Sequence, residues 1–125
     1  LVVFLDAVPA KTWEESVLPV SGKGAVIVKR NKNGMISQDT LEKIYSVAED
    51  NEIDIQFYSG ETDGPDGAIK QTGKNISSFV LGIPIKYINS PSQVCSKNDI
   101  KSAEKLLTAF LKDYVKEYFA WQIKI

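Results

Sequence analysis

Histidine is absent from the 125 residues of this sequence, and its absence removes several kinds of chemistry at once. A Ser–His–Asp triad, an imidazole-ligated zinc site and a histidine general base cannot be built from this chain alone. Cysteine occurs once, as Cys95, so no disulfide can form within the chain. Such sparse cysteine indicates a reducing compartment, and we expect a cytoplasmic protein. Without a histidine to activate it, Cys95 is not expected to act as a catalytic thiol.

An excess of charge and a long apolar run are also missing. The formal net charge is −1, which gives no electrostatic reason to expect nucleic acid or an anionic membrane as a partner. No apolar run reaches the roughly 20 residues that a membrane-spanning helix needs. Hydrophobic residues make up 43% and charged residues 25%, as in a soluble domain with its own core. The sequence starts without methionine, directly in an apolar run, so we expect a piece of a longer protein.

Strand-like and helix-like patterns alternate along the chain. Continuous or alternating apolar residues predict strands, and apolar residues three and four apart predict helices. We therefore expect an α/β fold in one domain, residues 1–125, as a three-layer sandwich whose mostly parallel sheet is flanked by helices. The expected elements are a strand at 1–5, a strand at 25–28, a helix at 39–51, a strand at 53–58, a short helix at 68–72, a strand at 78–87 and a helix at 97–118.

Local signals refine this expectation. The run 1–5 is apolar throughout, which is typical of a strand buried on both faces. Asp39, with Glu42 three residues later, resembles a capping box at the start of a helix. Pro84 lies inside a predicted strand and favours an edge position or a bulge. The tail 119–125 is unusually apolar for a terminus, and either packs on the domain or a partner or is foreign to the native chain.

Candidate chemical groups follow the predicted strands. Asp6 comes directly after the first strand, where a carboxylate can bind a metal, act as a base or cap a turn, and the pattern favours none of these. Asp63 and Asp66 flank Gly64-Pro65, and their spacing favours turn capping over a calcium loop. Gly22-Lys23-Gly24 lacks the spacing of a phosphate-binding loop and leads into a strand, so a structural turn is favoured.

Several segments, taken in order, resemble one family, the dinuclear-metal aminopeptidases that form tetrahedral assemblies. This family includes glutamyl and deblocking aminopeptidases, which are often called endoglucanases or cellulases. The resemblance runs from residue 1 to about residue 114 and matches the C-terminal part of the family's catalytic domain. The segments that carry it are Leu5-Asp6-Ala7-Val8-Pro9-Ala10, Gly22-Lys23-Gly24, Thr62-Asp63-Gly64, Ala68-Ile69 and Leu81-Gly82-Ile83-Pro84-Ile85-Lys86-Tyr87-Ile88-Asn89-Ser90-Pro91.

The resemblance implies roles for particular residues. Asp6 corresponds to a metal ligand of the family, whose metals are zinc or cobalt. Asn89 stands where the family has a histidine that binds the second metal, and an amide oxygen is a weaker zinc ligand than imidazole. Thr62 and Asp63 resemble a loop beside the metal centre, in its second shell. The turn at Gly22 and Gly24 is expected to shape the same site.

The resemblance also implies an activity that this chain cannot carry alone. The family hydrolyses N-terminal peptide bonds with a metal-bound hydroxide, and its remaining ligands and general base lie in sequence that precedes this segment. The alternative is a catalytically degenerate homologue that acts as a binding or assembly module. The expected partners are a peptide substrate and further copies of the chain in a homo-oligomer, with neither nucleic acid nor a membrane.

Overall fold

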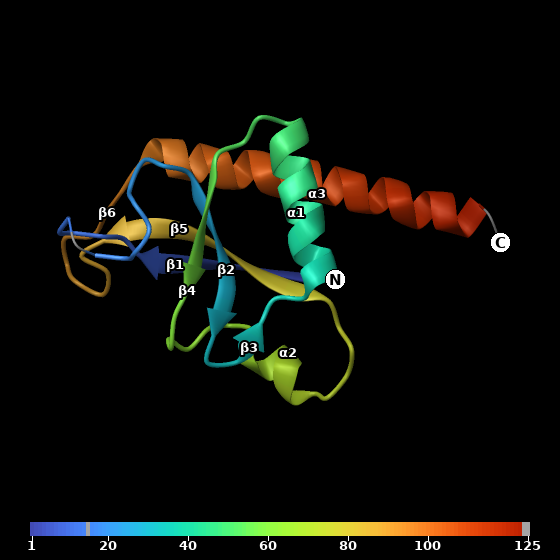
Figure 1. Ribbon diagram of the computed structural model, residues 1–125, viewed down its shortest axis with the longest axis horizontal. Coiled ribbons are helices and arrows are strands. Elements are labelled where there is room, and N and C mark those ends of the chain that lie inside the picture. Colours follow the sequence, from blue (N-terminus) through green and yellow to red (C-terminus); the bar gives the residue numbers. More distant parts are fainter. Residues whose placement is uncertain (15, 124–125) are drawn as a thin grey trace.

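The architecture comes from a computed structural model, which describes residues 1–14 and 16–123, with the backbone only for 121–123. Six strands and three helices alternate along it (Figure 1). In chain order they are β1 (Val2–Pro9), β2 (Ala25–Asn31), β3 (Gly34–Met35), α1 (Gln38–Asp50), β4 (Ile55–Ser59), α2 (Gly67–Gln71), β5 (Ser78–Lys86), β6 (Val94–Cys95) and α3 (Lys97–Ile123). The α/β class is thus confirmed. No helix among the described residues is long and apolar enough to cross a bilayer.

The sheet is mixed: its two longest strand pairings are parallel, and its three short pairings are antiparallel. β1 pairs parallel with β5, and β2 pairs parallel with β4 across the α1 crossover. β2 is antiparallel to β5, and the short β3 and β6 pair antiparallel with β2 and β5. The segment between β1 and β2 contains no helix, and a parallel connection usually needs one. That missing helix was the signal in the sequence that these two strands do not run in the same direction.

The two pairs of long strands meet at a narrow junction. β2 and β5 pair only through Val26 with Gly82 and Ile27 with Leu81, and the β1–β5 pair crosses the β2–β4 pair (Figure 1). The narrow junction also explains Pro84. This proline lies in an inner strand in unbroken register with β1, at neither the edge nor the bulge that were predicted, but β2 has already diverged there, so the missing N–H leaves no sheet partner unpaired.

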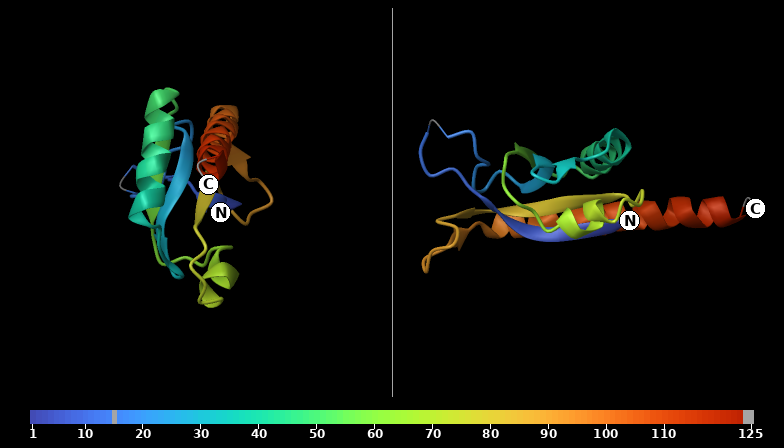
Figure 2. Two further views of the ribbon diagram at one scale, coloured as in Figure 1. Left: turned by 90° about the vertical axis from the view of Figure 1, so that its right-hand side faces the viewer. Right: turned by 90° about the horizontal axis from the view of Figure 1, so that it is seen from below.

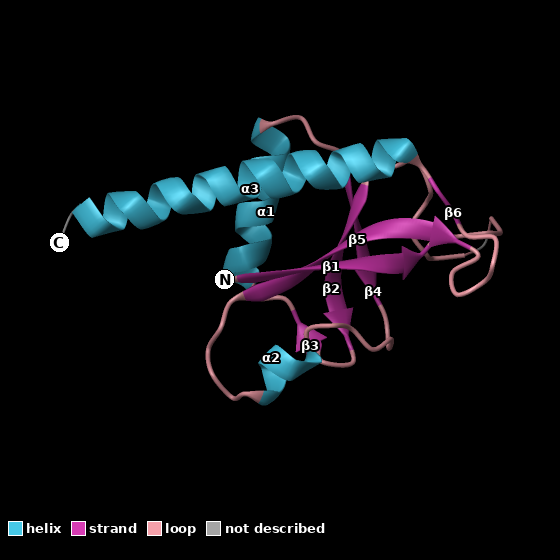
Figure 3. Cartoon of the chain, turned by 180° about the vertical axis from the view of Figure 1, so that it is seen from behind, coloured by secondary structure: helices cyan, strands magenta, loops and turns pink. Residues whose placement is uncertain are grey.

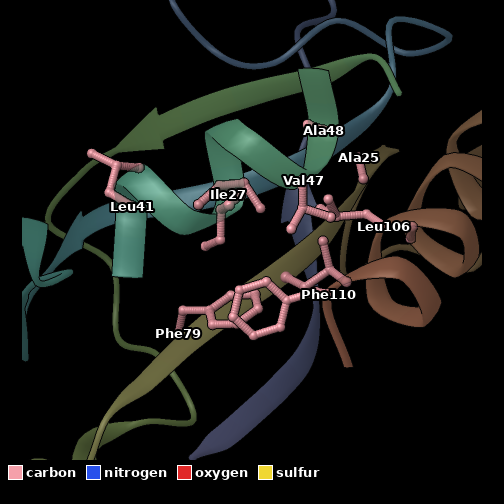
Figure 4. Close-up of a cluster of buried hydrophobic side chains, with 11 residues drawn as sticks. Ala25, Ile27, Leu41, Val47, Ala48, Phe79, Leu106 and Phe110 are labelled. Atoms are coloured by element: carbon pink, nitrogen blue, oxygen red, sulfur yellow. The ribbon is translucent and has the colours of Figure 1, made fainter. Parts of the chain in front are cut away.

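One hydrophobic core holds α1 and α3 against the same face of the sheet (Figure 4). Phe79 and Phe110 meet edge to face at its centre, with ring centroids 5.1 Å apart. The described residues therefore form two layers, and the second helical layer of the predicted sandwich is not found among them. The buried side chains of the core are Ala25, Ile27, Leu41, Ile44, Val47, Ala48, Phe79, Leu81, Ala103, Leu106 and Phe110.

Three local predictions need correction. β1 is an edge strand and not buried on both faces, since the side chain of Leu5 is 66% exposed. β1 also continues to Pro9, so Asp6 lies within the strand and not at its end. The cap of α1 is Ser37, whose Oγ accepts a hydrogen bond from the Thr40 N–H, and not Asp39.

The last helix is longer than predicted. α3 extends to Ile123 instead of ending near residue 118, and its C-terminal half projects past α1 and the sheet (Figure 2). The apolar tail is therefore helical up to residue 123, and residues 124–125 lie outside the described part of the chain.

Candidate functional site

A hollow of about 320 Å³ lies on the face of the sheet opposite the two long helices. Its position follows from the strand alternation, because Val8 lines this hollow whereas Leu5 lies beside α3 on the other face, and Asp6 borders both faces. The hollow has an apolar and a polar part to its lining. The apolar lining residues include Val8, Pro9, Val28, Val80 and Ile88, and the polar ones are Asp6, Asn31, Tyr58, Thr62, Asp63 and Asn89.

Four of the residues predicted for the site therefore come together, although they lie far apart in the sequence. Asp6 comes from β1, Thr62 and Asp63 from the loop after β4, and Asn89 from the turn after β5. Gly82 lies beside Asp6 across the β1–β5 pair, and an added Cβ there would lie 2.2 Å from Cγ2 of Val8. Gly82 thus leaves room for the side chain of Val8, which lines the hollow.

The loop after β4 is fixed by a buried carboxylate. Asp66 is 6% exposed, and its Oδ1 accepts hydrogen bonds from Nδ2 of Asn31 (3.0 Å) and Nδ2 of Asn33 (2.9 Å). Gly64 is required there, because an added Cβ would lie 2.4 Å from Asn31 Nδ2. The loop and α2 thus lie beside β3, at the end of β2 (Figure 3).

The two aspartates of this loop have different positions. Asp66 is a structural anchor, but not by the turn capping that its spacing favoured: its side chain makes no cap hydrogen bond at α2 and accepts from two asparagine side chains instead. The side chain of Asp63 is 88% exposed, with Lys32 Nζ at 3.9 Å. Sequence reasoning missed Asn31 and Asn33, for which the only signal was their position in a turn next to a strand end.

A surface ion pair flanks the same loop. Arg30 donates a hydrogen bond to Glu61, and this bond, together with the charge of the guanidinium, lowers the pKa of the Glu61 carboxyl. Because Glu61 is fully exposed, solvent screens the pair and it adds little to stability. The pair therefore orients the start of the loop more than it stabilises the domain.

The turn after β5 has unusual backbone geometry. Tyr87 and Asn89 have φ angles of 57° and 64°, in the left-handed region, and the Ser90 N–H donates to the Tyr87 carbonyl. Asparagine and histidine both adopt this region more readily than most residues. The backbone at position 89 is thus compatible with the histidine of the resemblance as well as with the asparagine present.

The turn at Gly22 and Gly24 lies elsewhere. The carboxylate of Asp99, in the first turn of α3, accepts hydrogen bonds of 2.8 Å from the N–H groups of both glycines. An added Cβ at Gly24 would lie 2.3 Å from the carbonyl oxygen of Asp54, at a φ of 109°. These glycines do not line the hollow, and their contacts hold the start of β2 against α3.

The donor set of the hollow is poor for zinc. Among residues 1–14 and 16–123, no group of three or more histidine, cysteine, aspartate or glutamate side chains could hold a metal ion. Asp6 Oδ1 accepts the N–H of Ala7 at 2.9 Å, which orients the carboxylate. Two carboxylates and an amide do not make a four-ligand site. The described residues alone therefore do not fit a zinc centre.

Comparison with solved structures defines the class of protein. A TET aminopeptidase from the marine sediment archaeon Thaumarchaeota archaeon SCGC AB-539-E09 superposes with a TM-score of 0.77 at 23% identity, over 86% of this chain and 31% of that chain. The TET1 peptidase of Pyrococcus horikoshii, which can assemble into a tetrahedron or a large octahedral shell, gives 0.63 at 27% identity, over 86% of this chain and 30% of that one. The fold is thus that of part of a TET aminopeptidase.

Sequence comparison identifies the family. The model of the M42 glutamyl aminopeptidase family matches residues 2–106, and the chain belongs to that family. A protein of Acetivibrio thermocellus named "Putative aminopeptidase" is 31% identical over 87 residues, which are 69% of this chain and 26% of that protein. The chain thus spans roughly a third or less of the length of the relatives that it matches. The resemblance drawn from the sequence motifs is confirmed.

Proposed function

We propose that this chain forms one wall of the active site of an aminopeptidase-like metallohydrolase that cleaves N-terminal peptide bonds. The observation that carries the proposal is the convergence of Asp6, Thr62, Asp63 and Asn89 on one hollow, from three separate segments. Membership of the M42 family supports the reaction class. On this proposal, the remaining ligands and the general base would come from polypeptide outside this sequence.

Asp6 is the proposed metal ligand of this wall. Its carboxylate is exposed to the hollow and oriented by the Ala7 N–H, so it needs no rearrangement to meet a cation. The described residues do not complete a zinc or cobalt site. We therefore assign to Asp6 a single bond to the metal, and we assign no step of the reaction to this chain alone. Asp63, which also lines the hollow, adds negative charge that would attract the α-ammonium group of a peptide.

A degenerate homologue that serves binding or assembly is the second candidate function. Two observations favour it: the sequence contains no histidine, and the described residues contain no cluster of metal-ligating side chains. In this case the hollow would persist as a feature of the fold without binding metal.

Calorimetric titration with zinc and cobalt tests the two candidates, on the longest available form of the protein. We expect Asp6→Ala to weaken metal binding by at least about 10- to 100-fold. Removing a residue that only hydrogen-bonds to a metal-binding side chain already lowers metal affinity by that factor. We expect Asn89→His to strengthen binding, because imidazole is a better zinc ligand and position 89 already has a suitable backbone. Hydrolysis of aminoacyl p-nitroanilides is measured in parallel.

Asp39→Ala is the matched control, since Asp39 is exposed at the start of α1, away from the hollow. It should leave metal affinity unchanged. If neither the wild type nor Asn89→His binds metal, the metallohydrolase proposal fails and the degenerate homologue is supported.

A further inference from the structure

The hollow that Asp6 and Asn89 line is enclosed by the fold itself. Its lining residues come from β1, β2, β4, β5, the loop after β4 and the turn after β5, and none of them lies at an end of the sequence. Val8 and Val80 are only 4% and 3% exposed, although both line the hollow. Because the described residues already cover these two side chains, the hollow is a true concavity and not an open face of the sheet.

Three valines from three neighbouring strands form much of its apolar lining. They are Val8 of β1, Val28 of β2 and Val80 of β5. Branching at Cβ restricts valine to few side-chain conformations, so this part of the hollow is formed before any ligand binds. The volume of about 320 Å³ lies at the lower end of the range of ligand sites, roughly 300–1,000 Å³. The hollow therefore has the size for one amino-acid residue.

The charged side chains of the hollow are acidic. Asp6 and Asp63 belong to its lining, and no lysine or arginine is among the described residues that line it. Lys32 Nζ lies 3.9 Å from Asp63 Oδ1, but the Lys32 side chain is 57% exposed and lies outside the lining. The hollow therefore attracts an ammonium group and offers no positive partner to a carboxylate inside it.

We propose that the hollow binds the N-terminal residue of a peptide whose first side chain is aliphatic, with the α-ammonium group beside Asp63 and the side chain against the three valines. The inference rests on the proposed function, since both place the N-terminus of a peptide in this hollow. An acidic first residue is disfavoured, because its carboxylate would lie against apolar side chains and near two like charges. This preference departs from the glutamyl substrates in the name of the family.

Hydrolysis of aminoacyl p-nitroanilides tests the preference, on the longest available form of the protein loaded with zinc or cobalt. We expect kcat/KM for the leucyl substrate to exceed that for the alanyl substrate at least about tenfold. A single methylene in an apolar pocket already changes kcat/KM by roughly 10–200-fold. The glutamyl substrate should be slower than both, because of the two aspartates in the lining.

Val28→Phe tests whether the valines contact the side chain of the substrate. Val28 is half-buried at the hollow, which has room for the larger ring. The ring would occupy the space of a leucyl side chain, so the ratio of leucyl to alanyl kcat/KM should fall at least about tenfold. A purely structural effect would lower both values equally. The matched control is Val17→Phe, which should keep the ratio, since Val17 is 97% exposed in a loop outside the hollow.

Methyl NMR of valine-labelled protein tests binding without any reaction. The probe is L-leucinol, an amino alcohol that cannot be hydrolysed. We expect it to shift the methyl signals of Val8, Val28 and Val80 and to leave those of Val17 unchanged. The amino alcohol of glutamate, 4-amino-5-hydroxypentanoate, should shift them less at the same concentration. Asp63→Asn should weaken the binding of L-leucinol, because it removes the negative charge beside the ammonium group and keeps the size of the side chain.

The outcomes separate this inference from the proposed hydrolase. Shifts of the three valines by L-leucinol without hydrolysis of any substrate contradict the hydrolase and support the inference. Hydrolysis that is fastest with the glutamyl substrate, or a leucyl to alanyl ratio that Val28→Phe does not change, overturns the inference alone. The absence of both shifts and hydrolysis overturns both.

Discussion

Asp99→Ala is expected to lower the free energy of unfolding by about 1–3 kcal/mol, since the Gly24 N–H is left buried without a partner at a cost of roughly that size, whereas Gly22 is exposed and its N–H can bind water. The Asp99 side chain is 0% exposed and receives the N–H groups of Gly22 and Gly24. Its removal leaves the Gly24 donor facing the empty space at the start of α3. Urea unfolding followed by circular dichroism measures the change.

The control for this prediction is Asp39→Ala. Asp39 and Asp99 both lie in the first turn of a helix, so both interact with the helix dipole, but Asp39 is exposed. We expect the control to cost about 0.3–1 kcal/mol. Equal losses in the two variants would show that the dipole, and not the buried hydrogen bonds, accounts for the role of Asp99.

The second large effect is expected for Asp66→Ala. This change removes the acceptor of Asn31 and Asn33, and we expect a loss of about 2–3 kcal/mol, because hydrogen bonds to a charged group contribute roughly 1.5–3 kcal/mol each and the loop can partly relax. The effect should be local. Faster hydrogen exchange is expected at Lys32 and Gly60, whose N–H groups donate to Thr62 and Arg30 across the base of the loop.

Asp63→Ala serves as the matched control in the same loop. Its carboxylate is exposed and its contact with Lys32 is long, so stability should change by less than about 0.5 kcal/mol. Metal titration of both variants then shows whether metal affinity depends on the position of the loop, which Asp66 fixes, or on the negative charge of Asp63. If Asp63→Ala destabilises the protein as much as Asp66→Ala, the division of the two carboxylates into a buried anchor and an exposed lining residue is wrong.

Several parts of the fold were predictable because their signals are local. The spacing of Leu41, Ile44 and Ala48 predicts α1, and the alternation at Ile55 and Phe57 predicts β4. Short-range periodicity reports which face of an element is buried. It does not report the direction of a strand within the sheet, which is why the antiparallel pairing of β2 with β5 was missed.

The site was predicted from ordered motifs and not from geometry. Asp6, Asp63 and Asn89 were named through the family resemblance, and their convergence on one hollow agrees with it. Gly22 and Gly24 belong to the same set of motifs but bind Asp99, 75 and more residues away in the sequence. No local pattern could assign that contact, because it depends on how α3 packs beside β2.

The sequence by itself determined what chemistry is excluded: without histidine, the chain cannot form a histidine-based triad, an imidazole-ligated zinc site or a histidine general base alone. It also determined the family, because several motifs occur in the family's order although each motif alone has low specificity. Only the tertiary structure decided which carboxylates are free. Asp66 and Asp99 are buried and fully engaged, whereas Asp6 and Asp63 face the hollow, because burial is set by contacts between distant segments and not by the residues on either side.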